Sequence, residues 1–224
     1  MIIDLISLFP EMLQGFLHSS ILARAQKYQF LQLRTHNLRH WATDDKHRRV
    51  DDRPFGGGAG MVLRPQPIVN AIQSLRREQS YVVYLSPDGV PLSTSVAKDL
   101  ATREHIIFLS GHYEGIDQRI RDKYVHMELS IGDYILTNGT LAAAVAIDVI
   151  CRYVPGVLGN DDSLRQDSFS DGLLAHPQYT QPRVFEAMAV PEVLLSGDHG
   201  AIQRWRQEQR RTRTEKLRPD LLEE

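Results

Sequence analysis

The sequence predicts an α/β domain with a mainly parallel sheet, followed by a small helical C-terminal domain. Short apolar runs typical of buried strands alternate with stretches whose apolar residues recur at helical spacing. A chain of 224 residues is long enough for one large domain and a small second one. After Pro155 and Gly156 the residues Gly, Asp, Asn and Ser become frequent, which places a domain boundary there.

The alternation begins with residues 2–9, IIDLISLF, which predict a buried strand. A helix follows, with apolar residues at Met12, Leu13, Phe16, Leu17, Ile21 and Leu22. The next elements are the strand FLQLRT, a polar loop through residue 60, a helix with Ile68, Val69, Ile72 and Leu75 on one face, the strand YVVYLS, a helix near 93–102, the strand HIIFLSG, a helix near 116–123 and the strand segment VHMELS.

Residues 140–150, TLAAAVAIDVI, predict a helix that is apolar on almost every side. We therefore expect it to be buried all round or to lie against a second subunit. Beyond the boundary, residues 182–218 predict helix with a break at 196–198. The expected organisation is an α/β domain at 1–158, a linker at 159–172 and a helical C-terminal domain at 173–224.

The composition argues against several classes of protein. No apolar run reaches the roughly 20 residues that span a bilayer, so we expect no membrane association. Asp4 stands where a secretory signal would be positively charged. The single cysteine, Cys151, excludes an internal disulfide and a cysteine-rich zinc site and favours the cytoplasm. The 9 histidines have no metal-ligand spacing, so we expect no metal site built from them.

A net charge of −2 gives no sign of a polyanionic partner, but basic residues gather at two places. One group comprises Arg34, Arg39, Lys46, Arg48, Arg49 and Arg53. The other comprises Arg204, Arg206, Arg210, Arg211, Arg213, Lys216 and Arg218. The second group includes Trp205 and has only Glu208 and Glu215 as counter-charges, which fits a surface that follows a phosphate backbone. Such runs are more often solvated helix faces.

Residues 51–61, DDRPFGGGAGM, form a stretch that is unusual for plain structure. Glycines allow a ligand to approach the backbone closely, but a flexible linker fits the composition equally well. The stretch lacks the Lys-Ser/Thr ending of a P-loop, which argues against nucleoside-triphosphate hydrolysis.

Three further stretches follow directly after predicted strands: LSPDG at 85–89, GHYEGID at 111–117 and SIGDYILTNGT at 130–140. In open α/β sheets ligands bind outside the carboxyl ends of the strands, so these loops predict one pocket. Each loop taken alone also fits an ordinary turn. Arg152 and Asp167 stand at the two ends of the linker, where a solvated helix end and a helix cap are the simpler interpretations.

In this order and spacing, DDRPFGGGAGM, LSP, GHYEGID, SIGDY, RYVPGVLG and DSF closely resemble the bacterial tRNA (guanine-N1)-methyltransferase family. The resemblance spans residues 1–224 and is specific, because six ordered motifs carry it. It implies the knotted methyltransferase class, whose cofactor pocket is a deep trefoil knot that no sequence rule suggests. It also implies methyl transfer from S-adenosylmethionine to N1 of the guanosine immediately 3′ of the anticodon, where another guanosine precedes that base.

The same resemblance implies tRNA as the partner, an obligate homodimer whose sites use both subunits, and a dependence on Mg²⁺, although no cage of carboxylates is visible. It implies Asp167 as the base that removes the guanine N1 proton and Arg152 as the cation near O6. No covalent intermediate is needed, so we interpret Cys151 as a core residue. The residues implied to hold adenosylmethionine are Leu85, Ser86, Pro87, Gly111, Tyr113, Glu114, Gly115, Ser130, Ile131, Gly132, Tyr134, Leu136 and Gly139.

The chain departs from the family pattern at two places. Most members carry a Gly-Gly pair and a later proline where this chain has Asn138-Gly139 and Ala142. Asn tolerates left-handed backbone, so we expect the turn to survive with a small effect on cofactor affinity. The chain ends at Glu224, earlier than many relatives, so we expect a shortened form of the domain that grips tRNA in the family.

Two other classes of function remain as alternatives. One is an RNA-binding module that keeps the fold without catalysis, and the three cofactor loops together with Arg152 and Asp167 argue against it. The other is a nicotinamide-dependent enzyme, which predicts a GxGxxG fingerprint that the chain lacks.

Overall fold

The computed structural model describes residues 1–43, 46–159, 164 and 166–222. They belong to two compact units, Met1–Gly159 and Asn160–Glu224, and each unit is described by itself. The predicted linker at 159–172 lies partly outside the described residues, so its conformation stays a prediction.

The first unit is built on one five-stranded sheet with strand order β2-β1-β6-β5-β7. Every neighbouring pair of strands runs parallel, which confirms the predicted parallel α/β sheet. The central strand β6 is buried at every residue, as expected where both faces of a parallel sheet are covered. The strands are β1 (Ile2–Ser7), β2 (Gln32–Asn37), β5 (Ser80–Pro91), β6 (His105–Ser110) and β7 (Met127–Ser130).

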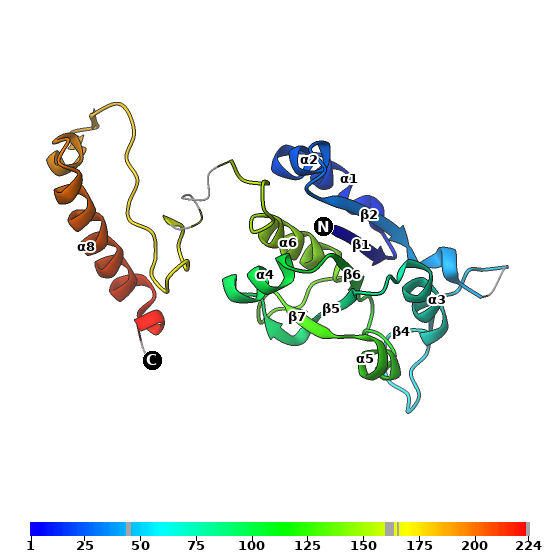
Figure 1. The fold of residues 1–224 in the computed structure, drawn as a ribbon. Helices are drawn as coiled ribbons and strands as arrows, with labels where there is room; N and C mark the ends of the chain where they lie inside the picture. The colour runs from blue at the N-terminus through cyan, green and yellow to red at the C-terminus, as the bar shows by residue number, and fades with distance from the viewer. Residues whose placement is uncertain (44–45, 160–163, 165, 223–224) are drawn as a thin grey trace. The chain divides into compact units, whose positions relative to one another are not determined.

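Helices cover both faces of this sheet (Figure 1). Each face has its own apolar core. Phe108 of β6 packs on one side and Ile107 on the other, because successive side chains of a strand point to opposite faces. The Phe108 side is covered by α1 (Gln14–Leu17), α2 (Ser20–Lys27), α4 (Thr94–Ala101) and α6 (Thr140–Cys151). The Ile107 side is covered by α3 (Pro65–Leu75), α5 (Gln118–Tyr124) and the 3-10 turn η2 (Leu38–Trp41).

The predicted helix over residues 12–22 is divided in the structure. The 3-10 turn η1 (Pro10–Leu13) and α1 precede a break, and α2 starts afresh. Ser19 is extended and Ser20 has a φ of 50°, so the helical hydrogen-bond pattern cannot run through them. Leu13, Leu17 and Leu22 are nevertheless all buried, as the apolar spacing predicted.

A buried carboxylate ties three strands together near the opposite end of the sheet from the predicted loops. Asp4 of β1 accepts hydrogen bonds from Arg34 at 2.5 Å, His36 at 2.6 Å and His105 at 2.7 Å. Burial alone would raise the pKa of Asp4, but these three hydrogen bonds outweigh it and lower the pKa to about 2. Asp4 is therefore ionised in the folded protein and belongs to the scaffold.

The second unit contains one long helix, α8 (His199–Leu217), whose first turn is capped by Asp198 through a hydrogen bond from the backbone N–H of Ala201. The predicted break at 196–198 is confirmed, since Gly197 has a φ of 75° and Asp198 precedes the helix as its cap, but the prediction of α-helix was wrong for residues 182–195. That stretch holds the hairpin β8 (Val184–Phe185) and β9 (Met188–Ala189), then the 3-10 turn η3 (Glu192–Leu195). A further 3-10 turn, η4 (Pro219–Leu222), follows α8.

The hairpin forms because Glu186 and Ala187 both have positive φ, the backbone of a two-residue turn that joins antiparallel strands. Pro182 and Pro191 flank it and cannot donate a helical hydrogen bond. Over the described residues, no helix is both long enough and apolar enough to cross a membrane.

Candidate functional site

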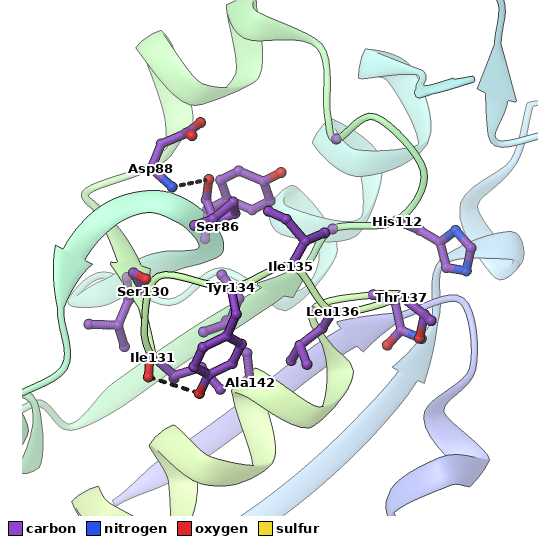
Figure 2. A pocket seen from close by; sticks show the side chains of 18 of the residues that line it. Ser86, Asp88, His112, Ser130, Ile131, Tyr134, Ile135, Leu136, Thr137 and Ala142 are labelled. Atoms are coloured by element: carbon purple, nitrogen blue, oxygen red, sulfur yellow. Dashed lines mark hydrogen bonds between the residues drawn. The ribbon is translucent and has the colours of Figure 1, made fainter. Parts of the chain in front are cut away.

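A pocket of about 390 Å³ opens at the carboxyl ends of β6 and β7, beside residues 84–88 of β5. Its size falls within the range of pockets that hold cofactor-sized molecules. Figure 2 shows Ser86, Ser130 and Leu136 gathered round it from separate loops. Every residue that the family resemblance assigns to adenosylmethionine lines this one pocket: Leu85, Ser86, Pro87, Gly111, Tyr113, Glu114, Gly115, Ser130, Ile131, Gly132, Tyr134, Leu136 and Gly139.

The first wall of the pocket is a bulge inside β5. Leu85 and Val90 both pair with Leu129 of β7, so residues 86–89 leave the sheet and return to it. LSPDG therefore forms a bulge within β5. The prediction that it is a loop after the strand was wrong. Gly89 makes the return fit, because a Cβ there would lie 2.4 Å from the backbone C of Glu128.

The second wall is the loop after β6, residues 111–117. Tyr113 has a φ of 59° and Gly115 a φ of 113°, which fold the chain sharply over the end of the strand. Gly111 is needed for a packing reason, since a Cβ there would lie 2.8 Å from the hydroxyl of Tyr84. The Tyr84 side chain therefore packs directly against this loop at Gly111.

The third wall is the loop after β7, residues 131–139, which returns to the second loop. The backbone N–H of Gly139 donates to the carbonyl of Gly111 at 2.8 Å, and a bridge joins His112 with Asn138. Asn138 accepts a hydrogen bond from the backbone N–H of Thr140 at 2.9 Å, which fixes the start of α6. Neither Asn138 nor Gly139 has a positive φ, so the left-handed turn that we expected there is absent and Asn carries no strain.

The glycine-rich stretch is a hairpin attached to the second loop. β3 (Asp51–Asp52) pairs with β4 (Val62–Leu63), and Leu63 then donates through its N–H to the carbonyl of Gly115 at 2.9 Å. Phe55 at its tip is fully exposed. Gly60 lies so close to Glu114 that a Cβ would clash with that side chain. The paired strands form the base of the hairpin, and the glycines lie in the exposed loop between them.

Several residues that line the pocket were not among those predicted from the sequence. His112, Thr137, Asn138 and Ala142 lie within or beside the motifs already selected, so their position in those motifs could have identified them. Tyr84, Asp88 and Arg121 also line it. Arg121 comes from α5, and no spacing rule connects it with the loops.

The charges at the pocket are mixed. Asp88, Glu114 and Arg121 line it, and Arg121 forms ion pairs with Asp88 and with Glu128 of β7. Hydrogen bonding to Glu128 raises the pKa of Arg121, so the guanidinium stays charged. Burial lowers the pKa of His112, which favours the neutral imidazole at physiological pH.

Arg152 and Asp167 belong to different units of the chain. Arg152 is the C-terminal cap residue of α6 in the first unit, and Asp167 lies in the second unit. Both side chains are half-buried and both have interaction partners. Their shared role therefore stays a prediction.

Cys151 is fully buried, and its thiol donates to the carbonyl of Asp148 at 3.0 Å. Burial raises the pKa of Cys151 to about 12, so the thiol is neutral and a poor nucleophile. The interpretation of this residue as part of the core is confirmed.

The C-terminal basic group divides into two kinds of residue. Arg210 is buried and donates to the carboxylate of Asp171 and to the carbonyl of Leu174, so it holds the second unit together. The exposed members are Arg204, Arg211, Arg213, Lys216 and Arg218, of which Arg211 pairs with Glu215 and Arg218 with Asp220. Any contact with a phosphate backbone would come from this exposed set.

In the described part of the chain, no group of three or more His, Cys, Asp or Glu side chains is arranged to hold a metal ion. The dependence on Mg²⁺ therefore stays a prediction.

Comparison with known proteins gives one consistent result. The family model described as tRNA (Guanine-1)-methyltransferase TrmD matches residues 1–224. A tRNA (guanine-N(1)-)-methyltransferase of Staphylococcus haemolyticus is 54% identical over 222 residues, which is 99% of this chain and 90% of that protein. One from Protochlamydia amoebophila is 50% identical over 222 residues, which is 99% of this chain and 100% of that protein.

Proposed function

The chain belongs to the tRNA (guanine-1)-methyltransferase family, and from this premise we propose that it transfers a methyl group from S-adenosylmethionine to N1 of the guanosine immediately 3′ of the anticodon in tRNA. The observation that carries the proposal is the convergence of three motif loops on one pocket at the carboxyl ends of β6 and β7, beside residues 84–88 of β5. Membership by itself supports tRNA guanine-N1 methylation. The methyl donor, the target position and the catalytic groups are the finer parts of the proposal.

The residues at the pocket fit adenosylmethionine. Backbone donors and acceptors of the three loops lie beside apolar side chains such as Leu85, Ile131 and Leu136, a combination suited to an amphipathic nucleoside. Glu114 supplies negative charge at the lining, which complements a positively charged ligand. When bound, adenosylmethionine supplies an electrophilic methyl group on a positively charged sulfur.

Asp167 acts as the general base in this proposal. Guanine N1 carries a proton at neutral pH, so its electron pair becomes available for attack only after a base takes that proton. A carboxylate can accept it, and Asp167 stands in the DSF motif that the family resemblance assigns to this role. Arg152 stabilises the negative charge that develops on O6 as the proton leaves. Cys151, neutral and buried, takes no part.

We further propose a homodimer in which α6 lies at the interface. Ala143, Ile147 and Ile150 of α6 are buried within the unit, but Leu141 and Val145, one turn apart, are 47% and 44% exposed. An apolar stripe of this kind on a helix is what a second subunit would cover. Sedimentation of Leu141→Glu would then show dissociation to monomers, whereas an unchanged dimer would place the interface elsewhere.

The knotted topology and the cellular location complete the proposal. Membership of the family supports a chain that is threaded at the pocket. A tRNA substrate places the enzyme in the cytoplasm. The second unit, with the exposed basic residues of α8, supplies the tRNA-binding surface.

Isothermal titration with adenosylmethionine tests the proposal against its two alternatives. The methyltransferase binds adenosylmethionine with one site per chain. An RNA-binding module without catalysis binds tRNA and leaves the titration flat. A nicotinamide-dependent enzyme responds to a nicotinamide dinucleotide instead, and either of these last results would overturn the proposal.

A further inference from the structure

Arg121 of α5 links the β5 bulge to the edge of the sheet. Its Nε donates to Oε1 of Glu128 at 2.9 Å and its Nη2 donates to Oε2 of the same carboxylate at 2.5 Å. The same Nη2 also donates to Oδ2 of Asp88 at 2.9 Å. One guanidinium thus joins α5, β7 and the bulge, which are distant from one another along the chain.

The bulge packs closely against β7 at Gly89, but Asp88 lies outside the ladder of β5 and β7. Residues 86–89 leave the ladder between β5 and β7, so the regular interstrand hydrogen bonds stop there. Inside the bulge, the backbone N–H of Asp88 donates to Oγ of Ser86 at 3.2 Å (Figure 2). Ser86 and Pro87 line the pocket. The position of this pocket wall therefore depends both on the packing of Gly89 against β7 and on what holds Asp88.

Arg121 is well suited to hold it. Its side chain is only 22% exposed, and its charge lies 5.6 Å from the centre of the Tyr84 ring, whose hydroxyl supports Gly111. A guanidinium offers several donors in a fixed plane, so it can serve Glu128 and Asp88 together in a way that an ammonium group cannot. Asp88 itself is 62% exposed, so its own pair with Arg121 is screened by solvent and its effect should be modest.

We propose that Arg121 is a positioning residue for cofactor binding, which holds the Ser86–Gly89 bulge in its binding geometry through Asp88. The inference rests on the proposed function, since it concerns the pocket that is assigned to adenosylmethionine. It names a pair that the family motifs do not contain: Arg121 lies outside all of them, and Asp88 follows LSP.

Titration calorimetry with adenosylmethionine on Asp88→Ala, Arg121→Met and the double variant tests the inference. Asp88→Ala should raise Kd about threefold to fivefold without lowering the melting temperature, as expected for one partly exposed ion pair. Arg121→Met should raise Kd about tenfold or more, because it leaves two carboxylates without their shared donor. In the Arg121→Met background, Asp88→Ala should have no further effect, since the two residues act through one contact.

The control variant is Arg119→Met on the same helix. Arg119 is 73% exposed, pairs with Asp117 at 2.7 Å and does not line the pocket, so its loss should leave Kd unchanged. Arg121→Lys keeps the positive charge but loses the planar guanidinium that donates to both carboxylates. Its affinity for adenosylmethionine should therefore lie between those of Arg121→Met and the wild type. At saturating adenosylmethionine, the single-turnover rate of Asp88→Ala should fall by less than its affinity does.

Two results separate failure of this inference from failure of the proposed function. If the wild-type protein shows no heat with adenosylmethionine, the proposed cofactor is wrong and the inference falls with it. If the wild-type protein binds and Asp88→Ala binds equally tightly, or if the effects of the two single variants simply add, the positioning role is wrong while the proposed function stands. Because Asp88→Ala removes a mostly exposed side chain, its result decides the matter even where Arg121→Met does not fold.

Discussion

Replacing Gly89 by alanine should displace the β5 bulge, which forms one wall of the pocket that we assign to adenosylmethionine. A Cβ at this position would lie 2.4 Å from both the carbonyl C of Glu128 and the N of Leu129, whereas ordinary contacts begin at 3.4 Å. The bulge must therefore move by about 1 Å, because the atoms that it meets belong to the backbone of β7. Gly89 has no positive φ, so the effect is one of space and not of backbone strain.

Overpacking of this kind costs about 1–3 kcal/mol of folding free energy. A displacement of about 1 Å in a binding site can reduce function by up to about 10²-fold. We therefore expect Gly89→Ala to raise the Kd for adenosylmethionine about tenfold to a hundredfold. The free energy of unfolding should fall by about 1–3 kcal/mol. Titration calorimetry and urea unfolding measure the two quantities on the same protein.

Gly15→Ala is the matched control. Gly15 lies in α1, has no positive φ, and a Cβ there would meet no atom within 4 Å. Alanine should leave the affinity unchanged and stabilise the helix by at most about 1 kcal/mol. If Gly89→Ala binds adenosylmethionine as tightly as the wild type, the bulge either does not return against β7 as described or does not form the wall of the site.

Three further predictions follow from other parts of the molecule. Asp167→Asn should keep the fold and the cofactor affinity but lower the single-turnover methylation rate by roughly 10²–10⁴-fold, and a rate within about threefold of wild type would place the base elsewhere. Replacing the exposed Arg211 and Arg213 by alanine should weaken tRNA binding and reduce its log–log salt dependence by up to about one unit per lost phosphate contact, whereas an unchanged slope would make them solvated residues. Asp4 contributes about 2 kcal/mol to the free energy of unfolding above pH 4, because its pKa falls from 3.8 in the unfolded chain to about 2 in the folded protein. This contribution disappears as the pH drops from 4 to 2, so the difference in free energy of unfolding between wild type and Asp4→Asn, measured in urea, should narrow over that range. A constant difference would argue against the role assigned to Asp4.

The sheet and the location of the pocket could be predicted because both follow from local patterns. Runs such as HIIFLS, apolar on both sides, indicate a strand buried on two faces, and parallel strands place their carboxyl ends along one edge. Three loops that follow such strands must therefore lie near one another. The bulge of residues 86–89 was not predictable, because it depends on how β5 meets β7 and not on the LSPDG sequence alone.

The second unit was predicted less well, for reasons that its residues explain. Val184–Ala189 forms a hairpin around Glu186 and Ala187, which lack the Asn-Gly or Asp-Gly signal of a two-residue turn. Arg210 belonged to a basic run in the sequence, yet it is buried against Asp171, 39 residues away. Neither feature leaves a local pattern in the sequence. The hairpin depends on a backbone conformation that is rare for Glu and Ala, and the burial of Arg210 depends on a contact with a distant residue.

Methyl transfer to tRNA transcripts tests the central claim most directly. The protein would be incubated with adenosylmethionine carrying a labelled methyl group and with a transcript that has guanosine immediately 3′ of the anticodon, beside a transcript with adenosine there. The account predicts one labelled methyl group per guanosine transcript, recovered as 1-methylguanosine after digestion, and none in the adenosine transcript. Label on another atom or at another position, or no transfer by protein that binds both substrates, would contradict it.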